Sequence, residues 1–192
     1  MTAEPLERLR RWHGEAAAVL PEADAMTLAT ATPDGEPSIR VVLLKGIDDR
    51  GIRFFTNYES RKGRELDANP RAAAVLYWQP LHRQVRLAGA VERLSAEESD
   101  AYFATRDRGS RLGAWASRQG SVIEGRGQLE EALAAAGERY PGDAIPRPEY
   151  WGGYRLAPVA VEFWEGRPNR LHDREHFLLE PDGTWRAEHL SP

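Results

Sequence analysis

The sequence of 192 residues contains no cysteine. Disulfide bonds, thiolate catalysis and cysteine-ligated metal sites are therefore excluded. No apolar run approaches the roughly 20 residues that a membrane-spanning helix needs. The N-terminal stretch MTAEPLERLRRWHG also lacks the apolar centre of a signal peptide. We therefore expect a cytoplasmic protein that is not inserted in a membrane.

A strong net charge is missing as well, because 26 lysines and arginines face 30 aspartates and glutamates. This balance excludes the basic composition typical of nucleic-acid-binding domains, so we expect no nucleic acid as a partner. The G-x-S-x-G signature of a nucleophile elbow does not occur. His172 and His176 are four residues apart but lack the glutamate that follows the first histidine of a zincin. We therefore expect no metal site.

What the sequence does contain is an ordinary globular composition, 41% apolar and 29% charged, with many turn signals. Residues 5–19 have apolar side chains at helical spacing, and Pro21 ends that helix. A hairpin is predicted over residues 25–48, with its turn at Pro33-Asp34-Gly35. The next predicted elements are a strand over 51–58, a helix over 60–70, strands over 71–79 and 83–94, and helices over 95–106, 108–118 and 127–139.

A loop rich in proline and glycine follows over residues 141–153. Three further strands are predicted over 154–166, 169–179 and 184–190, the last two joined by an Asp182-Gly183 turn. Seven or eight strands with short helices between them predict a mainly β protein of α+β type. Because hairpins dominate, the sheet should be antiparallel and closed into a barrel. We divide the chain into an N-terminal helix or arm, 1–24, and a barrel domain, 25–192.

The segment RPNRLHDR, 167–174, places Arg170, His172 and Arg174 at alternate positions. On a strand these side chains would share one face, about 7 Å apart. Like charges at that spacing repel. The pattern therefore indicates either a solvated strand face or a face that holds an anionic or electron-rich ligand.

Arg61 and Lys62 lie in the first turn of the helix predicted over 60–70, with Ser60 as its N-cap. Cations are unfavourable at that end because the helix dipole is positive there. Free backbone N–H groups together with two cations nevertheless form a good phosphate site. A solvated charged helix is the alternative interpretation.

Three further groups of polar residues have the same two interpretations. Arg40 and Lys45 flank the apolar run 41–44, and Gln84 shares a strand face with Arg86. Tyr102 and Arg106 lie four residues apart on one helix face, with Ser110 just beyond it. A phenol, a guanidinium and a hydroxyl together suit a phosphate monoester, but each group also suits a solvated surface.

The chain resembles the pyridoxine/pyridoxamine 5′-phosphate oxidase family. The stretches that carry the resemblance follow in family order from about residue 25 to the C-terminus: AMTLAT, PSIRVVLLKG, FFTNYESRKGRELDANPRAA, RQVRLAGAVERLSAEESDAYFATRDRGSRLGAWAS, PRPEYWGGYRL, VEFWEGRPNRLHDR and the final LSP. The resemblance implies a split β-barrel that is antiparallel and Greek-key-like. It also implies a homodimer with FMN in the dimer interface.

The resemblance assigns roles to residues of this chain. Those implied to surround FMN are Arg40, Val41, Lys45, Phe55, Thr56, Arg61, Lys62, Gln84, Gln119, Gly120, Trp164 and Arg174. Those implied to bind the substrate are Lys45, Tyr102, Arg106, Ser110, Arg170 and His172, of which Arg170 and His172 would lie over the pyridine ring and act in catalysis. Gly120 departs from the serine that is usual in the family, which removes one hydroxyl donor.

The implied activity is the oxidation of pyridoxamine 5′-phosphate and pyridoxine 5′-phosphate to pyridoxal 5′-phosphate, with O2 as the electron acceptor and H2O2 as a product. Two alternatives remain. One is a flavin oxidase of the same fold that acts on dihydrophenazine carboxylates. The other is a split-barrel protein without catalytic activity that binds flavin or haem. The presence of Lys45, Tyr102, Arg106 and Ser110 favours a phosphorylated substrate.

Overall fold

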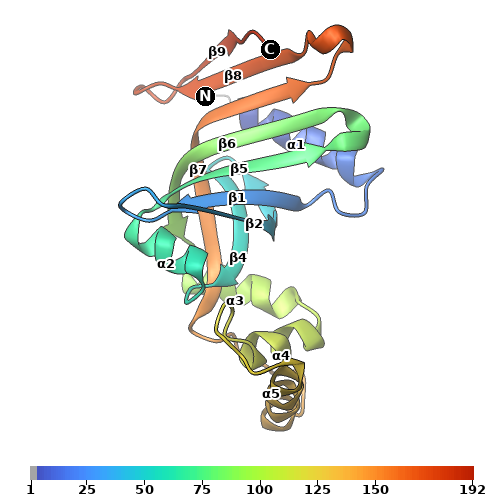
Figure 1. Ribbon diagram of the computed structural model, residues 1–192, viewed down its shortest axis with the longest axis vertical. Coiled ribbons are helices and arrows are strands. Elements are labelled where there is room, and N and C mark those ends of the chain that lie inside the picture. Colours follow the sequence, from blue (N-terminus) through green and yellow to red (C-terminus); the bar gives the residue numbers. More distant parts are fainter. Residues whose placement is uncertain (1–3) are drawn as a thin grey trace.

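The computed structural model describes residues 4–192, which form one curled antiparallel sheet with helices packed around it (Figure 1). Its elements, in chain order, are α1 (Glu4–Ala17), β1 (Ala25–Ala31), β2 (Pro37–Leu43), β3 (Gly46–Asp48), β4 (Gly51–Asn57), α2 (Arg61–Ala68), β5 (Arg71–Trp78), η1 (Gln79–Leu81), β6 (Arg83–Arg93), α3 (Ala96–Thr105), α4 (Arg108–Ala116), α5 (Arg126–Arg139), β7 (Trp151–Glu165), η2 (Pro168–Arg170), β8 (Asp173–Leu179) and β9 (Trp185–His189). Within these residues no helix is both long and apolar enough to cross a bilayer.

The strands follow the order β2-β1-β5-β6-β7-β4-β3, and β8 and β9 continue from β7. Every strand pair is antiparallel, which confirms that prediction. After β4 the chain passes through α2 and returns as β5 beside β1, a Greek-key-like connection. Among the described strands, β2 and β3 lie at the two ends of this order and do not pair with each other, so the sheet forms a half-barrel rather than the closed barrel predicted from the hairpins.

Two local predictions near the C-terminus are wrong. Residues 151–153 belong to β7 and not to the preceding loop, because Gly152 and Gly153 pair with Thr56 and Phe55 of β4. At Gly152 a Cβ atom would lie 2.0 Å from the Tyr58 hydroxyl oxygen. The two glycines therefore permit close packing across the sheet rather than a turn.

The strand predicted over 169–179 begins only at Asp173. Asn169 and Arg170 have φ of 60° and 62°, in the left-handed region, where no strand can continue. Arg170, His172 and Arg174 therefore do not alternate along one strand face, and of the three only Arg174 lies in β8.

The main hydrophobic core lies inside the half-barrel and includes α1. Leu6, Leu9 and Trp12 of this helix are buried, and the Trp12 ring meets Phe163 of β7 edge-to-face at 5.1 Å. A second, smaller cluster packs α3, α4 and α5 around Phe103, Leu112, Ala136, Ile145 and Trp151. The division after residue 24 stays a prediction, but α1 is part of the barrel's core.

We expect Leu9→Ala to lower the free energy of unfolding by about 2–5 kcal/mol, because it removes a fully buried side chain and leaves a cavity. Urea denaturation of the whole chain measures this change. Arg11→Ala on the exposed face of the same helix is the control and should change stability by less than about 0.5 kcal/mol. Equal stability of Leu9→Ala and wild type would show that α1 is detachable from the core.

Candidate functional site

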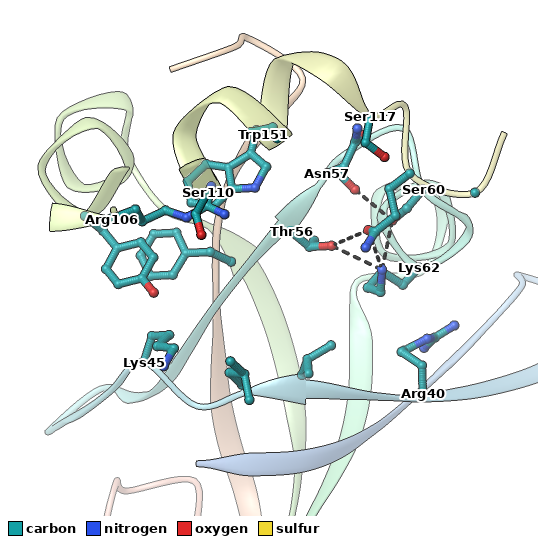
Figure 2. A pocket seen from close by; sticks show the side chains of 18 of the residues that line it. Arg40, Lys45, Thr56, Asn57, Ser60, Lys62, Arg106, Ser110, Ser117 and Trp151 are labelled. Carbon is teal, nitrogen blue, oxygen red and sulfur yellow. Dashed lines mark hydrogen bonds between the residues drawn. The ribbon is translucent and has the colours of Figure 1, made fainter. Parts of the chain in front are cut away.

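A cavity of about 990 Å³ lies between β2, β4, α2, α3 and α4 (Figure 2). Most of the site residues named from the sequence line it: Arg40, Val41, Lys45, Phe55, Thr56, Arg61, Lys62, Tyr102, Arg106, Ser110, Gln119 and Gly120. In Figure 2, Arg40, Ser60 and Lys62 lie on one side of the cavity and Lys45, Arg106 and Ser110 on the other. The polar residues thus form two separate groups within one space.

The first group is built on the start of α2. Ser60 caps this helix and accepts a hydrogen bond from the Gly63 N–H, as predicted. The Lys62 ammonium is buried and donates to Thr56 Oγ1 at 3.1 Å, Ser60 Oγ at 3.2 Å and Gln119 Oε1 at 2.9 Å. All three partners are neutral oxygens. Burial, followed by the nearby charge of Arg40, lowers the pKa of Lys62 to about 8.

The two arginines of this group are held by Glu65, a buried residue of α2. Arg61 Nε donates to Glu65 Oε1 at 2.7 Å, and Arg40 Nη2 lies 3.4 Å from Glu65 Oε2. Burial alone would raise the pKa of Glu65. The hydrogen bonds from Ser38, Thr30 and Arg61 outweigh that effect, so its pKa falls to about 2. Glu65 therefore stays ionised and keeps both guanidinium groups beside the cavity.

The second group lies around the end of α3. Arg106 is half-buried, and its Nη1 atom is buried without a hydrogen-bond partner in the described structure. Its guanidinium carbon lies 4.7 Å from the Trp151 ring centroid and 5.5 Å from that of Phe103. Burial lowers the pKa of Arg106, against a smaller opposing effect of Tyr102 and Asp107. Within residues 4–192 no carboxylate lies within ion-pair distance of either Arg106 or Lys62.

Aromatic rings from three elements form the wall beside Arg106. Phe55 of β4 and Tyr102 of α3 stack with centroids 3.8 Å apart, and Trp151 of β7 lies 5.6 Å from Phe55, nearly parallel to it. The stack orients the Tyr102 phenol, which lines the cavity. It also excludes water from one side of the Arg106 guanidinium.

The segment after α4 closes a further side of the cavity. Thr56 Oγ1 donates to Gln119 Oε1 at 3.0 Å, which ties this segment to β4. Gly120 has a φ of 87°, a backbone conformation that residues other than glycine rarely adopt. A glycine therefore suits the backbone at this position, where the resemblance implied a serine.

The remaining sequence-predicted residues do not line this cavity. Gln84 of β6, Trp164 of β7 and Arg174 of β8 lie directly opposite one another in the sheet register. His172 packs against Trp164, with ring centroids 4.7 Å apart, and its Nδ1 accepts a hydrogen bond from the Arg167 N–H. These residues, with the exposed Arg170, form a second cluster, which we call the β6–β8 cluster.

Glu162 was not among the site residues predicted from the sequence. It is the negatively charged partner of the arginines in this cluster. Its buried carboxylate accepts from Arg174 Nε at 2.9 Å and from Arg86 Nη1 at 3.1 Å. The repulsion expected between alternate cations is therefore relieved in two ways. Arg170 leaves the strand, and Arg174 is paired with a neighbour on β7.

Several other residues of the cavity lining were also missed, among them Asn57, Asp107, Ser117 and Trp151, as was Glu65 behind the wall. Glu65 could have been found, because it lies four residues after Arg61 on a predicted helix, the spacing of an ion pair. Trp151 could not have been found, because the sequence predicts a loop over residues 151–153.

Comparison with known proteins now places this geometry in a family. Residues 13–164 match the family described as pyridoxamine 5′-phosphate oxidase. Residues 151–192 match the pyridoxine 5′-phosphate oxidase C-terminal dimerisation region. The chain belongs to the pyridoxamine 5′-phosphate oxidase family. The family resemblance noted in the sequence is thereby confirmed.

Relatives with known names match this chain over almost its whole length. A pyridoxine/pyridoxamine 5′-phosphate oxidase of Cupriavidus necator is 58% identical, covering 98% of this chain and 89% of the relative. One of Salinibacter ruber is 56% identical, covering 100% and 91%. The crystal structure of PhzG from Burkholderia lata, in complex with tetrahydrophenazine-1-carboxylic acid, superposes with a TM-score of 0.92 at 35% identity, covering 100% of this chain and 94% of PhzG.

A pyridoxamine 5′-phosphate oxidase-related, FMN-binding protein of Nostoc punctiforme superposes with a TM-score of 0.81 at 22% identity, covering 100% of both chains. At that identity the likeness shows the fold alone. Together these structures confirm the antiparallel split-barrel fold that the resemblance implied.

We expect Glu65→Gln to lower the free energy of unfolding at pH 7 by roughly 1–3 kcal/mol, because it weakens a buried, multiply hydrogen-bonded carboxylate site. The folded-state pKa of about 2 lies below the unfolded value of about 4.3. The stabilisation is therefore fully present above about pH 5 and is lost as pH falls towards 2. Denaturation of both proteins between pH 2 and 7 measures this, with the exposed-pair variant Glu59→Gln as control. A stability difference that does not change with pH would contradict the assignment.

Proposed function

We propose that the protein binds FMN and oxidises pyridoxamine 5′-phosphate and pyridoxine 5′-phosphate to pyridoxal 5′-phosphate, with O2 as acceptor. One observation carries the proposal. Two cations without carboxylate partners in the described chain, the buried Lys62 and the half-buried Arg106, line one cavity from different sides. A buried cation without a counter-charge is unfavourable, so each favours an anionic ligand group. Family membership makes two phosphates the natural candidates.

The group at the start of α2 suits the FMN phosphate. Lys62, Arg61 and Arg40 supply positive charge, and the first turn of α2 supplies free backbone N–H groups. The hydrogen-bond partners of Lys62 are three neutral oxygens, so no carboxylate contacts its ammonium, and a phosphate would supply that contact. The cavity volume of about 990 Å³ is at the upper end of the range for small-molecule sites.

The group at the end of α3 suits the substrate phosphate. Arg106 presents its unpartnered Nη1, and Lys45, Tyr102 and Ser110 add an ammonium and two hydroxyl groups. A guanidinium, an ammonium and hydroxyls together match the several oxygens of a phosphate monoester. The ligand would then extend from this end of the cavity towards the flavin.

The β6–β8 cluster suits a role in the site of a second copy. Trp151 lines the cavity and Trp164 belongs to the cluster, thirteen residues later on the same strand, roughly 40 Å of extended chain. The two ends of this strand lie too far apart for one ligand to reach both within a single chain. The matched dimerisation region, 151–192, includes the cluster's Trp164, Arg170, His172 and Arg174. In a homodimer the partner's cluster would complete the cavity, with Gln84, Trp164 and Arg174 at the flavin and Arg170 and His172 over the pyridine ring.

Bound FMN would supply the two-electron redox chemistry, which protein side chains cannot. The balanced reactions are pyridoxine 5′-phosphate with O2 to pyridoxal 5′-phosphate and H2O2, and pyridoxamine 5′-phosphate with O2 and water to the same products and NH3. The chain's residues bind and align the reactants. Lys45 and Arg106 hold the phosphate, while Arg170 and His172 orient the ring and stabilise charge that develops on it.

A second candidate is supported by the superposition with PhzG, whose structure holds tetrahydrophenazine-1-carboxylic acid. A flavin oxidase of such tricyclic carboxylates would use the same fold. The phosphate group of Lys45, Tyr102, Arg106 and Ser110 favours the B6 esters instead. Activity on each class of substrate discriminates between the two.

The test is H2O2 release by the FMN-loaded protein with pyridoxamine 5′-phosphate and with pyridoxamine. We expect at least tenfold higher kcat/KM for the phosphorylated amine. Arg106→Ala should lower that kcat/KM by about 10- to 100-fold through KM and leave FMN bound, because a hydrogen-bonded charge contact contributes about 1.5–3 kcal/mol. Arg139→Ala, which removes an arginine stacked on Trp115 outside the cavity, is the matched control.

Four outcomes would contradict this proposal or part of it. Protein that stays colourless in excess FMN would refute flavin binding. Equal rates on the two amines would refute the phosphate site, and turnover of a dihydrophenazine carboxylate alone would favour the second candidate. Loss of FMN from Arg106→Ala would mean that the two ends of the cavity are assigned the wrong way round.

A further prediction concerns pH. The Lys62 ammonium is charged below its pKa of about 8 and neutral above it, so FMN affinity of the apoprotein should fall as pH rises through 8. The FMN phosphate itself keeps its charge there, since its second pKa is about 6. We expect Kd, from quenching of FMN fluorescence, to rise about 10- to 30-fold between pH 7 and 9.5. Lys62→Arg should abolish this rise, and an undiminished rise in that variant would exclude Lys62 as its cause.

A further inference from the structure

Lys45, at the substrate end of the cavity, has a carboxylate partner that the proposed site does not include. Its Nζ lies 2.9 Å from Oδ2 of Asp24, the residue before β1. The other carboxylate oxygen, Oδ1, lies 2.9 Å from Nε2 of His13 on α1. A chain of three polar side chains therefore joins the N-terminal helix to the cavity. Asp24 itself does not line the cavity.

The backbone holds Asp24 in place. Its carbonyl oxygen accepts a hydrogen bond from the Leu44 N–H at 2.9 Å, which fixes it beside Lys45 where β1 and β2 pair. Trp78 Nε1 donates to the Ala23 carbonyl at 3.0 Å. The carboxylate therefore cannot leave Lys45 by a shift of its backbone, and any change in the pair must come from rotation of side chains.

His13 holds the carboxylate from the other side. Its helix is anchored in the main core by Leu9 and Trp12, one turn and one residue before it. The His13 ring also packs against Trp78, with centroids 6.4 Å apart. The imidazole is thus fixed relative to the barrel, and Asp24 is held between two nitrogen groups.

Asp24 is ionised at neutral pH. Burial raises its pKa, but the hydrogen bonds and charges of Lys45 and His13 outweigh burial and lower the pKa below its ordinary value. A negative charge therefore lies next to the ammonium that the substrate phosphate needs. Arg106, at the same end of the cavity, has no such partner in the described chain.

We propose that Asp24, held by His13, is a counter-charge that sets how strongly the site attracts the phosphate of its B6 ligand. The inference rests on the proposed function, since it assigns the phosphate to Lys45. An incoming phosphate must share Lys45 with Asp24 and approach its negative charge, so binding is weaker than Lys45 and Arg106 alone would give. The product retains the phosphate, and the same repulsion favours its release.

Asp24→Asn tests the proposal, because asparagine keeps an oxygen that accepts from Lys45 and loses only the charge. We would titrate the FMN-loaded protein with pyridoxal 5′-phosphate and with pyridoxal, and compare the two Kd values. The preference for the phosphorylated ligand should rise about three- to tenfold, the effect of one partly screened charge at close range. Asp49→Asn removes the same charge from an exposed pair with Arg10 and should leave the preference unchanged.

His13→Ala removes the second support of the carboxylate. It should raise the same preference by a smaller factor in the wild-type background and by none in the Asp24→Asn background. A purely structural role of His13 predicts instead equal effects in the two backgrounds and on both ligands, which would overturn its place in the proposal.

The experiment gives different results if the proposed function is wrong and if only the role of Asp24 is wrong. If the wild type already shows no preference for pyridoxal 5′-phosphate, the phosphate site is wrong and the inference falls with it. If the wild type prefers the ester and Asp24→Asn leaves the preference unchanged or lowers it, the counter-charge role is refuted while the proposed function stands.

Discussion

The relative position of the cavity and the β6–β8 cluster depends on one strand. β7 is 15 residues long, and β6 pairs along most of it, while β4 occupies the other side of its first half and β8 that of its second half. Its first residue, Trp151, forms part of the cavity wall, and Trp164 near its end anchors the β6–β8 cluster. Because the register is fixed by buried Tyr154, Leu156, Val161 and Phe163, the two clusters cannot shift relative to each other.

Carboxylates are distributed around the site in a consistent way. Glu65 holds Arg40 and Arg61, Glu162 holds Arg174 and Arg86, and Asp24 holds Lys45. Each of these acids lies outside the cavity lining. They orient the cations while leaving the cavity positively charged, since Lys62 and Arg106 have no acid partner in the described structure. This arrangement combines rigid placement of the cations with attraction for anions. The phosphates of the two proposed ligands, FMN and the B6 ester, fit it, one at each end of the cavity.

The sequence predicted local features that short-range chemistry determines. The Pro33-Asp34-Gly35 turn and the Ser60 cap are both present in the structure. The predictions from the sequence were wrong where contacts between distant parts of the chain determine the local structure. Gly152 and Gly153 look like turn residues, yet they are glycine because Tyr58 and Leu94 occupy the adjacent space. The grouping of Lys62 with Gln119, or of Asp24 with His13 and Lys45, depends on contacts between elements that no sequence periodicity reveals.

The failed strand prediction at residues 169–172 has a physical reason that bears on the site. Two consecutive residues other than glycine, Asn169 and Arg170, adopt left-handed φ, at a cost of about 1–2 kcal/mol each. Such strain persists only where the surroundings impose it, and it is common where side chains are positioned for a ligand. Here it turns Arg170 out of the strand and leaves it exposed, while His172 stays packed on Trp164. A regular strand would have kept both on the same sheet face as Arg174, already paired with Glu162. The bend instead leaves Arg170 outside its own sheet and exposed, as the proposed contact with a second copy requires.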